Sequence, residues 1–210
     1  MILVVGKILL AYLIGSVSGS LWLGRLRGVD IRTLGSGNAG GTNALRTQGF
    51  KFAFGVMLID VGKGALATWI GLQGEADTTL ALRTALACGF AAVLGHVWPI
   101  FHGFRGGKGV ATIIGLLLVL WPALLLPMIA VFALVLTTTG YVGLGSILGT
   151  AAMLPALWLW SARPAREWIV AALVLAVFVT YTHRANVQRL LAGNEHRFEK
   201  ARLLAKWFRR

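Results

Sequence analysis

The sequence has few charged residues and very few acidic ones. Only 13% of its 210 residues are charged and 57% are hydrophobic, whereas an average soluble domain carries roughly 25% charged residues. Seven residues are acidic and 20 are basic, so the formal net charge is +13. This composition excludes an ordinary soluble domain. It indicates a chain embedded in a lipid bilayer, with a polar minority that is mostly cationic.

Further absences narrow the possible chemistry. Cys88 is the only cysteine and lies in an apolar run, which excludes an internal disulfide and a cysteine-based metal site. The acidic residues are scattered and form no carboxylate cluster for two-metal catalysis. The sequence carries no zinc-finger, RNP or basic-zipper pattern. We therefore expect no nucleic acid, no metal and no other cofactor.

Apolar runs long enough to cross about 30 Å of hydrocarbon follow one another along the chain. Arg25 and Arg27 come directly after the first run, which places its end in the cytoplasm and the N-terminus outside. This run is too long for the core of a signal peptide, so we expect it to remain as an anchor. The expected spans are residues 2–23, 52–72, 80–100, 141–160 and 168–182, with one or two more within 106–139.

The stretch 106–139 has two readings. It is either one long helix kinked at Pro122 and Pro127, or a hairpin of two short crossings with Trp121 and Pro122 at the turn. The basic tail that begins at Arg184 belongs in the cytoplasm, and an outside N-terminus then requires an odd number of crossings. The hairpin satisfies this requirement with seven spans, whereas the single helix gives six.

The sequence therefore predicts an all-α integral membrane protein with seven transmembrane helices. Residues 1–210 form a single polytopic membrane domain, with the N-terminus outside and the C-terminus cytoplasmic. Cytoplasmic loops cover about residues 25–51 and 101–109, and a basic amphipathic tail covers about residues 184–210. From Glu195 onward the tail is either a helix lying on the anionic inner leaflet or a solvated basic segment.

The least lipid-like stretch is residues 35–46, GSGNAGGTNALR. Its glycines free backbone amides that can turn toward one point. Ser36, Thr42 and Asn43 add neutral donors, and Arg46 adds a planar cationic fork suited to phosphate. This first glycine-rich stretch is either an anion-binding loop or a turn that lets two helices pack closely.

A second glycine-rich stretch, residues 105–112 (RGGKGVAT), opens the fourth span. Glycines ahead of a helix present free amides at the positive end of the helix dipole, and Lys108 adds a full charge. The pattern is not a Walker A loop, because His102 stands where its first glycine belongs and Gly109 follows the lysine. We expect an anion site without nucleotide hydrolysis.

Two charged residues fall inside the second span. Asp60 and Lys63 would each cost about 2.5–3.5 kcal/mol at the bilayer centre, so we expect them to face protein or water. Their i, i+3 spacing places them on one helical face. They can form a mutual ion pair, line a polar cavity under the first glycine-rich stretch, or do both.

A last polar group, residues 183–195, follows the final span. His183 and Asn186 are i, i+3 neighbours, and Arg189 and Glu195 lie close behind them in the sequence. Either His183 and Asn186 reach a ligand held by the two glycine-rich stretches, or His183 is an ordinary polar tip at the membrane interface. We expect His96 to be structural.

These stretches resemble the signature stretches of a known bacterial family. GSGNAGGTN with Arg46, DVGKG from Asp60, GHVWPIFHGFRGGKGVAT from Gly95 and HRANVQRLLAGNE from His183 are similar to the acyl-phosphate:glycerol-3-phosphate acyltransferase (PlsY) family. The resemblance implies an inner-membrane enzyme of phospholipid biosynthesis whose active site faces the cytoplasm. It would transfer a fatty acyl group from acyl phosphate to the primary hydroxyl of glycerol 3-phosphate, giving lysophosphatidic acid and inorganic phosphate.

The residue patterns and the resemblance together assign expected roles to individual positions. The catalytic candidates are Ser36, Arg46, Lys108, His183 and Asn186. The candidates for binding substrate phosphate are Gly35, Ser36, Gly37, Asn38, Thr42, Asn43, Arg46, Gly106, Gly107, Lys108 and Gly109. The structural polar candidates are Asp60, Lys63 and Glu195. The expected partners are the two substrates and membrane lipids, and the chain is expected to act as a monomer.

The proton acceptor and two rival functions stay open. The sequence lacks the H-x-x-x-x-D pair with which most glycerolipid acyltransferases deprotonate a hydroxyl, so the acceptor is either His183 or an oxygen of the donor phosphate. The rivals are a transporter or channel for a phosphorylated small molecule and a lipid-headgroup binder without turnover. We favour the enzyme, because the polar stretches cluster on the cytoplasmic side with no matching group at the outer ends.

Overall fold

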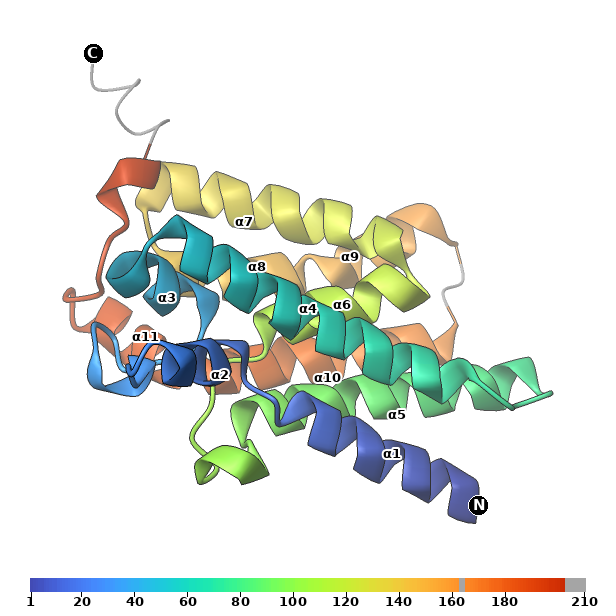
Figure 1. The fold of residues 1–210 in the computed structure, drawn as a ribbon. Helices are drawn as coiled ribbons and strands as arrows, with labels where there is room; N and C mark the ends of the chain where they lie inside the picture. Colours follow the sequence, from blue (N-terminus) through green and yellow to red (C-terminus); the bar gives the residue numbers. More distant parts are fainter. Residues whose placement is uncertain (163–164, 203–210) are drawn as a thin grey trace. The chain divides into compact units, whose positions relative to one another are not determined.

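The computed structural model describes residues 1–162 and 165–202, and all regular structure in these residues is helical (Figure 1). The predicted all-α class is therefore confirmed. The α-helices are α1 (Ile2–Gly15), α2 (Gly19–Leu26), α3 (Gly41–Gln48), α4 (Phe50–Leu72), α5 (Thr78–Val97), α6 (Val110–Leu120), α7 (Leu125–Thr139), α8 (Val142–Ala151), α9 (Met153–Trp160), α10 (Arg166–Thr182) and α11 (Arg184–Leu191). Four 3-10 turns are η1 (Ile31–Thr33), η2 (Ile100–His102), η3 (Pro122–Leu124) and η4 (Glu199–Ala201).

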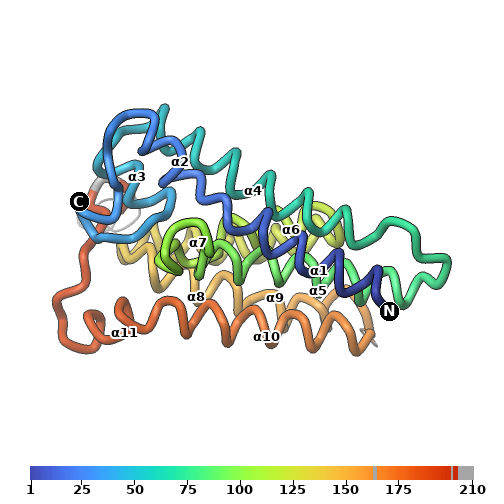
Figure 2. Tube along the Cα trace, turned by 60° about the horizontal axis from the view of Figure 1, so that its bottom comes forward, coloured from blue at the N-terminus to red at the C-terminus, as the bar shows by residue number. Residues whose placement is uncertain are grey.

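The chain packs as two compact units. The first runs from Met1 to Trp121, and the second begins at Pro122. In the first unit α4 is central, because it packs against α1, α2, α3, α5 and α6. In the second unit α8 is central, because it packs against α7, α9, α10 and α11. The two sets of helices can be followed by colour in Figure 2.

Several helices have the length and composition of membrane spans. In the described residues, four helical stretches are long and apolar enough to cross a bilayer, or up to six if each of two bent helix pairs counts as one crossing. The 23 residues of α4 extend about 34 Å at 1.5 Å per residue. By contrast α6 is apolar but has only 11 residues. The chain is a multi-pass membrane protein, and the count of seven stays a prediction.

The first predicted span is broken, not continuous. The structure divides residues 2–23 between α1 and α2, which meet at an angle of 45°. The break covers Ser16 to Ser18, and it leaves the carbonyl of Val17 and the amide of Gly19 outside the helical ladder. Side chains of α4 take up both groups: Lys63 Nζ donates to Val17 O at 2.8 Å, and Gly19 N donates to Asp60 Oδ1 at 3.1 Å. Buried backbone groups need such partners.

The stretch 106–139 is not one kinked helix. The helix α6 ends at Leu120, Trp121 has non-helical dihedral angles (φ −156°, ψ 79°), and η3 precedes α7. Pro122 therefore stands at the start of a new element, and Pro127 lies in the first turn of α7, where a missing amide hydrogen costs little. The helix is interrupted where the hairpin reading requires it.

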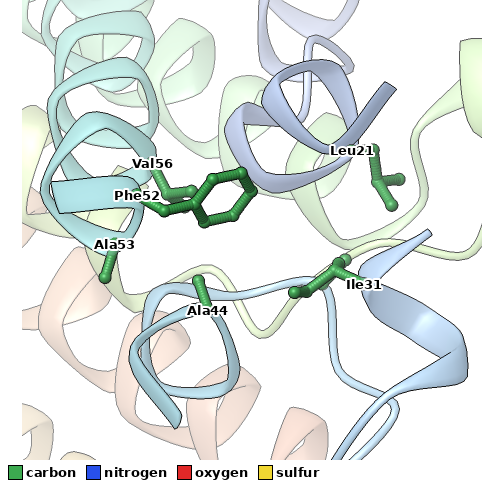
Figure 3. Close-up of a cluster of buried hydrophobic side chains, with 7 residues drawn as sticks. Leu21, Ile31, Ala44, Phe52, Ala53 and Val56 are labelled. Carbon is green, nitrogen blue, oxygen red and sulfur yellow. The ribbon is translucent and has the colours of Figure 1, made fainter. Parts of the chain in front are cut away.

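Close packing in the first unit depends on glycine. A Cβ atom built on Gly64 would overlap the backbone of Thr112, and one on Gly115 would overlap the backbone of Val61. These contacts bring α4 and α6 together at backbone distance, a common way for helices to associate in membranes. A small apolar core lies between α2, α3 and α4, where Phe52 points toward its neighbours (Figure 3).

The C-terminal segment returns to the turn between α7 and α8 (Figure 1). Phe198 N donates to Gly140 O at 2.8 Å, and Arg197 Nε donates to the hydroxyl of Tyr141 at 2.9 Å. The residues from Glu195 to Arg202 contain only the short turn η4. The second half of the tail helix that the sequence allows, residues 203–210, lies outside the described residues.

Candidate active site

Asn43 organises the first glycine-rich stretch from inside. It is 1% exposed. Its Nδ2 donates to the carbonyl oxygens of Ile31 and Leu34 at 3.0 and 2.9 Å, and its Oδ1 accepts from Ser36 N at 3.0 Å. Three backbone groups of the loop thus meet on one buried amide, which is how a loop without regular structure satisfies its polar groups. The structure gives Asn43 a positioning role.

The other donors of this stretch lie at the surface. Gly35 and Gly37 have φ values of 55° and 70°, in the left-handed region that favours glycine, and they hold Ser36 between them. Ser36, Thr42 and Arg46 are all exposed, and the last two lie one turn apart on α3. Two neutral hydroxyls and one guanidinium are therefore placed where a soluble anion can reach them.

Arg32 ties this region to the segment before α6. Asp30 holds the guanidinium, with Nε to Oδ1 at 3.0 Å and Nη2 to Oδ2 at 2.8 Å. Arg32 Nη1 then donates to the carbonyl oxygens of His102 and Arg105 at 2.9 and 3.3 Å. Donation from Arg32 lowers the pKa of Asp30, so the pairing is complete above the usual aspartate pKa and weakens as pH falls through the lowered value. No sequence motif marks Arg32 for this role.

The second glycine-rich stretch lies on the end of α5. Gly106 N donates to Val97 O and Gly107 N donates to His96 O, both at 3.1 Å. The sequence predicted free amides at these glycines, and the structure corrects this, because the last carbonyls of α5 accept them. A Cβ atom on Gly106 would overlap His96 O, and one on Gly107 would overlap His96 Nε2. Glycine is required here for close packing.

The other groups that the sequence predicts to bind an anion lie at Lys108 and at the start of α6. Gly109 has a left-handed φ of 88° and caps α6, whose first helical hydrogen bond runs from Ile113 N to Gly109 O. The amides of the first turn therefore have no partner within the helix, and half-buried Lys108 directly precedes them. A Cβ atom on Gly107 would also approach Ala39 O at 2.8 Å, so the two glycine-rich stretches lie against each other.

A buried polar network lies beneath these stretches. Lys63 Nζ lies 2.9 Å from Asp60 Oδ1 and 2.9 Å from His96 Nδ1, and all three side chains are almost fully buried. The predicted ion pair between Asp60 and Lys63 is therefore confirmed. Sequence reasoning did not connect His96 to the pair, since 33 residues separate it from Lys63 and only the folded packing of α4 on α5 brings them together.

In the second unit the last polar group forms a network of its own. Glu195 accepts from Asn186 Nδ2 and from Arg189 Nε, each at 2.6 Å. His183 stands at the bend between α10 and α11, which meet at 60°, and its Nδ1 lies 2.8 Å from Val179 O. Both His183 and Asn186 are buried, at 3% and 6% exposure. His183 is therefore not an exposed polar tip.

Each unit thus gathers part of the predicted site. The first unit brings together the two glycine-rich stretches and the Asp60–Lys63 pair, and the second brings together Asn186 and Glu195 with His183 at the adjoining bend. Asn38 and Lys108 are half-buried. Within the described residues no group of three or more His, Cys, Asp or Glu side chains could hold a metal ion. That Arg46, Lys108 and His183 share one pocket stays a prediction.

Helices of membrane length, joined by glycine- and cation-rich stretches, define an integral membrane protein. The family model of glycerol-3-phosphate acyltransferase matches residues 5–193. The chain belongs to this family, and it is an enzyme of the PlsY type. Similar relatives named glycerol-3-phosphate acyltransferase come from Clostridioides difficile (45% identical, covering 89% of this chain and 91% of the relative) and Chlorobaculum tepidum (37% identical, covering 93% and 96%).

Two solved structures have the same fold. Both are crystal structures of PlsY (YgiH), described as an integral membrane glycerol 3-phosphate acyltransferase, and both match with a TM-score of 0.83. The glycerol 3-phosphate form is 35% identical and covers 93% of this chain and 95% of that chain. The lysophosphatidic acid form is 34% identical and covers 96% and 98%.

Proposed function

We propose that this protein transfers a fatty acyl group from acyl phosphate to the primary hydroxyl of glycerol 3-phosphate. The products are lysophosphatidic acid and inorganic phosphate. The observation that carries the proposal is the match to PlsY, whose structures are described with glycerol 3-phosphate and with lysophosphatidic acid. The first is the acceptor and the second the product of such a transfer. The chain matches that protein over nearly its whole length.

The charge of the site suits this chemistry. Both substrates are anions, so part of the barrier lies in bringing them together. Arg46 and Lys108 supply positive charge, and the first-turn amides of α6 supply donors at the positive end of its dipole. As the hydroxyl attacks, negative charge develops on the acyl carbonyl oxygen and the leaving phosphate, and fixed donors stabilise both.

The bond changes need no cofactor. The hydroxyl oxygen of glycerol 3-phosphate forms a bond to the acyl carbon, and the bond from that carbon to the phosphate oxygen breaks. The hydroxyl proton leaves either to a non-bridging oxygen of the donor phosphate or to His183. Because acyl phosphate is a mixed anhydride with a good leaving group, we propose the donor phosphate as the acceptor.

We further propose that the reaction takes place at the cytoplasmic face of the inner membrane, by a monomer. The acyl chain of the donor lies among the helices, and soluble glycerol 3-phosphate arrives from the water side. Arg25, Arg27, Arg32, Arg105 and Lys108 support this orientation, because basic residues are retained on the cytoplasmic side of membrane proteins.

A direct assay tests the proposal. Purified protein in detergent is mixed with glycerol 3-phosphate and either acyl phosphate or acyl-CoA, and inorganic phosphate and lysophosphatidic acid are measured. We expect both products with acyl phosphate and no acylated product with acyl-CoA. Transfer from acyl-CoA alone would overturn the donor assignment. Substrate binding without turnover would identify a headgroup binder, and uptake of glycerol 3-phosphate by proteoliposomes without product would identify a transporter.

A further inference from the structure

The surroundings of Lys63 determine where the proton of His96 resides. Lys63 Nζ has three neighbours at hydrogen-bonding distance: Val17 O at 2.8 Å, Asp60 Oδ1 at 2.9 Å and His96 Nδ1 at 2.9 Å. An ammonium group has three donors and no acceptor. Asp60 favours the charged form of the lysine, so each of the three protons goes to one neighbour. His96 Nδ1 must therefore accept.

A neutral imidazole that accepts at Nδ1 carries its proton on Nε2. In the alternative tautomer Nδ1–H would donate to Asp60 Oδ1, which lies 3.4 Å away. That proton would point at the ammonium group of Lys63, which lies closer to Nδ1 than the carboxylate does. The geometry therefore favours the Nε2–H tautomer.

The Nε2–H group lies directly beneath the second glycine-rich stretch. A Cβ atom on Gly107 would overlap His96 Nε2 and would also approach Ala39 O in the first stretch. His96 is 3% exposed, and its ring nitrogens have no hydrogen-bond partner in the described residues other than those at Nδ1. In the described residues this nitrogen is not one of the fully enclosed polar atoms that lack a partner, so a ligand can reach it. A ligand oxygen between the stretches would accept its hydrogen.

We propose that His96 is a further substrate-binding residue, whose Nε2–H group, fixed by Lys63, donates a hydrogen bond to a phosphate oxygen held between the two glycine-rich stretches. The inference rests on the proposed function only for the identity of the phosphate, which belongs to glycerol 3-phosphate or to acyl phosphate. His96 contributes a neutral donor next to the cation of Lys108. In this arrangement the pair of Asp60 and Lys63 positions His96 and does not touch the substrate.

Two substitutions of His96 separate binding from support of the fold. In His96→Gln the amide nitrogen stands where Nε2 stood, so the donor is kept and the contact with Lys63 is lost. In His96→Asn the amide group stands where Nδ1 stood, so the contact with Lys63 is kept and the donor is lost. A structural role makes the Gln variant the worse enzyme, whereas a binding role makes the Asn variant worse.

The measurement is KM for each substrate with the other saturating, together with thermal stability in detergent. We expect His96→Asn to raise KM for one substrate about tenfold or more, the factor that corresponds to a hydrogen bond to a charged group. We expect His96→Gln to raise it less than threefold while being the less stable variant. The substrate whose KM rises is the one that His96 contacts. Unchanged KM values in His96→Asn would overturn the inference.

A spectroscopic test does not depend on turnover. In protein labelled with ¹⁵N-histidine, the His96 signals are those lost in His96→Gln. We expect the shifts of a neutral ring protonated at Nε2, and a change in the Nε2–H signal when glycerol 3-phosphate or acyl phosphate is added. Inorganic phosphate serves as the control for a simple anion effect. A proton on Nδ1, or no response to either substrate, contradicts the inference even if the enzyme transfers acyl groups normally. Failure of wild-type turnover would instead overturn the proposed function.

Discussion

Two histidines of this chain are held in opposite tautomers by their neighbours. His96 accepts at Nδ1 from Lys63, whereas His183 places Nδ1 at 2.8 Å from a carbonyl oxygen of Val179, which can only accept. His183 therefore carries its proton on Nδ1, which makes its Nε2 an acceptor. One ring is suited to donate to an anion and the other to accept from a hydroxyl, although both are buried.

The role of His183 can be measured by replacing it with glutamine. Glutamine keeps the hydrogen-bonding capacity of the histidine but cannot act as a base. If the donor phosphate takes the hydroxyl proton, we therefore expect kcat of His183→Gln to fall less than about tenfold. A general base contributes about 10²–10⁴-fold. The measurement is phosphate release under saturating substrates, with Arg46→Ala and Lys108→Ala as variants that should lose binding or turnover. A fall of a hundredfold or more in His183→Gln would identify His183 as the base.

Replacing Asn43 should disturb the first glycine-rich stretch without touching its exposed donors. Asn43→Ala removes three hydrogen bonds, each worth about 0.5–1.5 kcal/mol. The carbonyls of Ile31 and Leu34 still accept from Leu34 N and Gly37 N, whereas the amide of Ser36 loses its acceptor. We expect a lower unfolding temperature in detergent and a higher KM for glycerol 3-phosphate. Asn43→Asp keeps the acceptor for Ser36 but sets a carboxylate against two carbonyls, so it should be no better. A normal KM in both variants would show that the loop holds its shape without this side chain.

At the scale of helices, glycine sets how closely α4 and α6 approach. Gly115→Ala places a methyl group against the backbone of Val61, and Gly64→Ala places one against Thr112, in both cases with no flexible side chain that could move aside. Overpacking of this kind costs about 1–3 kcal/mol or more. We expect both variants to unfold at a lower temperature and to lose activity, because α6 carries the second glycine-rich stretch at its start.

The same helix provides the control. Gly62 is exposed on α4, and a Cβ atom there meets nothing within 4 Å. Gly62→Ala should be neutral or stabilising by up to about 1 kcal/mol, the difference in helix propensity. Equal effects of Gly62→Ala and Gly115→Ala on the unfolding temperature would mean that helix propensity, and not the backbone contact, decides the outcome.

At the scale of the whole molecule, the number of crossings determines on which side each loop lies. In a Cys88→Ser background, single cysteines at Ala76, Thr33 and Ala192 report the loop after α4, the loop before α3 and the segment after α11. With seven crossings, an impermeant thiol reagent should label only Ala76→Cys from the outside, and Thr33→Cys and Ala192→Cys only in inverted vesicles. Labelling of Ala192→Cys from the outside would indicate six crossings.

Much of the fold was predictable because apolar length decides where helices lie in a membrane. The i, i+3 pairing of Asp60 and Lys63 was predictable for a local reason, since one turn of helix fixes it. Contacts between distant segments were not. Nothing in the sequence shows that Arg32 reaches a carbonyl 70 residues away, or that Gly107 is a glycine because His96 lies against it. Such contacts depend on how helices pack, which composition and periodicity do not encode.

The break in the first span fixes which of the two positions, 60 or 63, must carry the negative charge and which the positive charge. A carbonyl oxygen meets the ammonium group and an amide hydrogen meets the carboxylate, so each charge is matched to the sign of one backbone dipole. In a variant with the two residues exchanged, the opposite charges would still attract each other. However, the carboxylate would then face a carbonyl oxygen and the ammonium group would face an amide hydrogen, so both backbone contacts would be repulsive. We expect the exchanged protein to accumulate poorly in membranes, in amounts no greater than those of a variant that lacks one of the two charges.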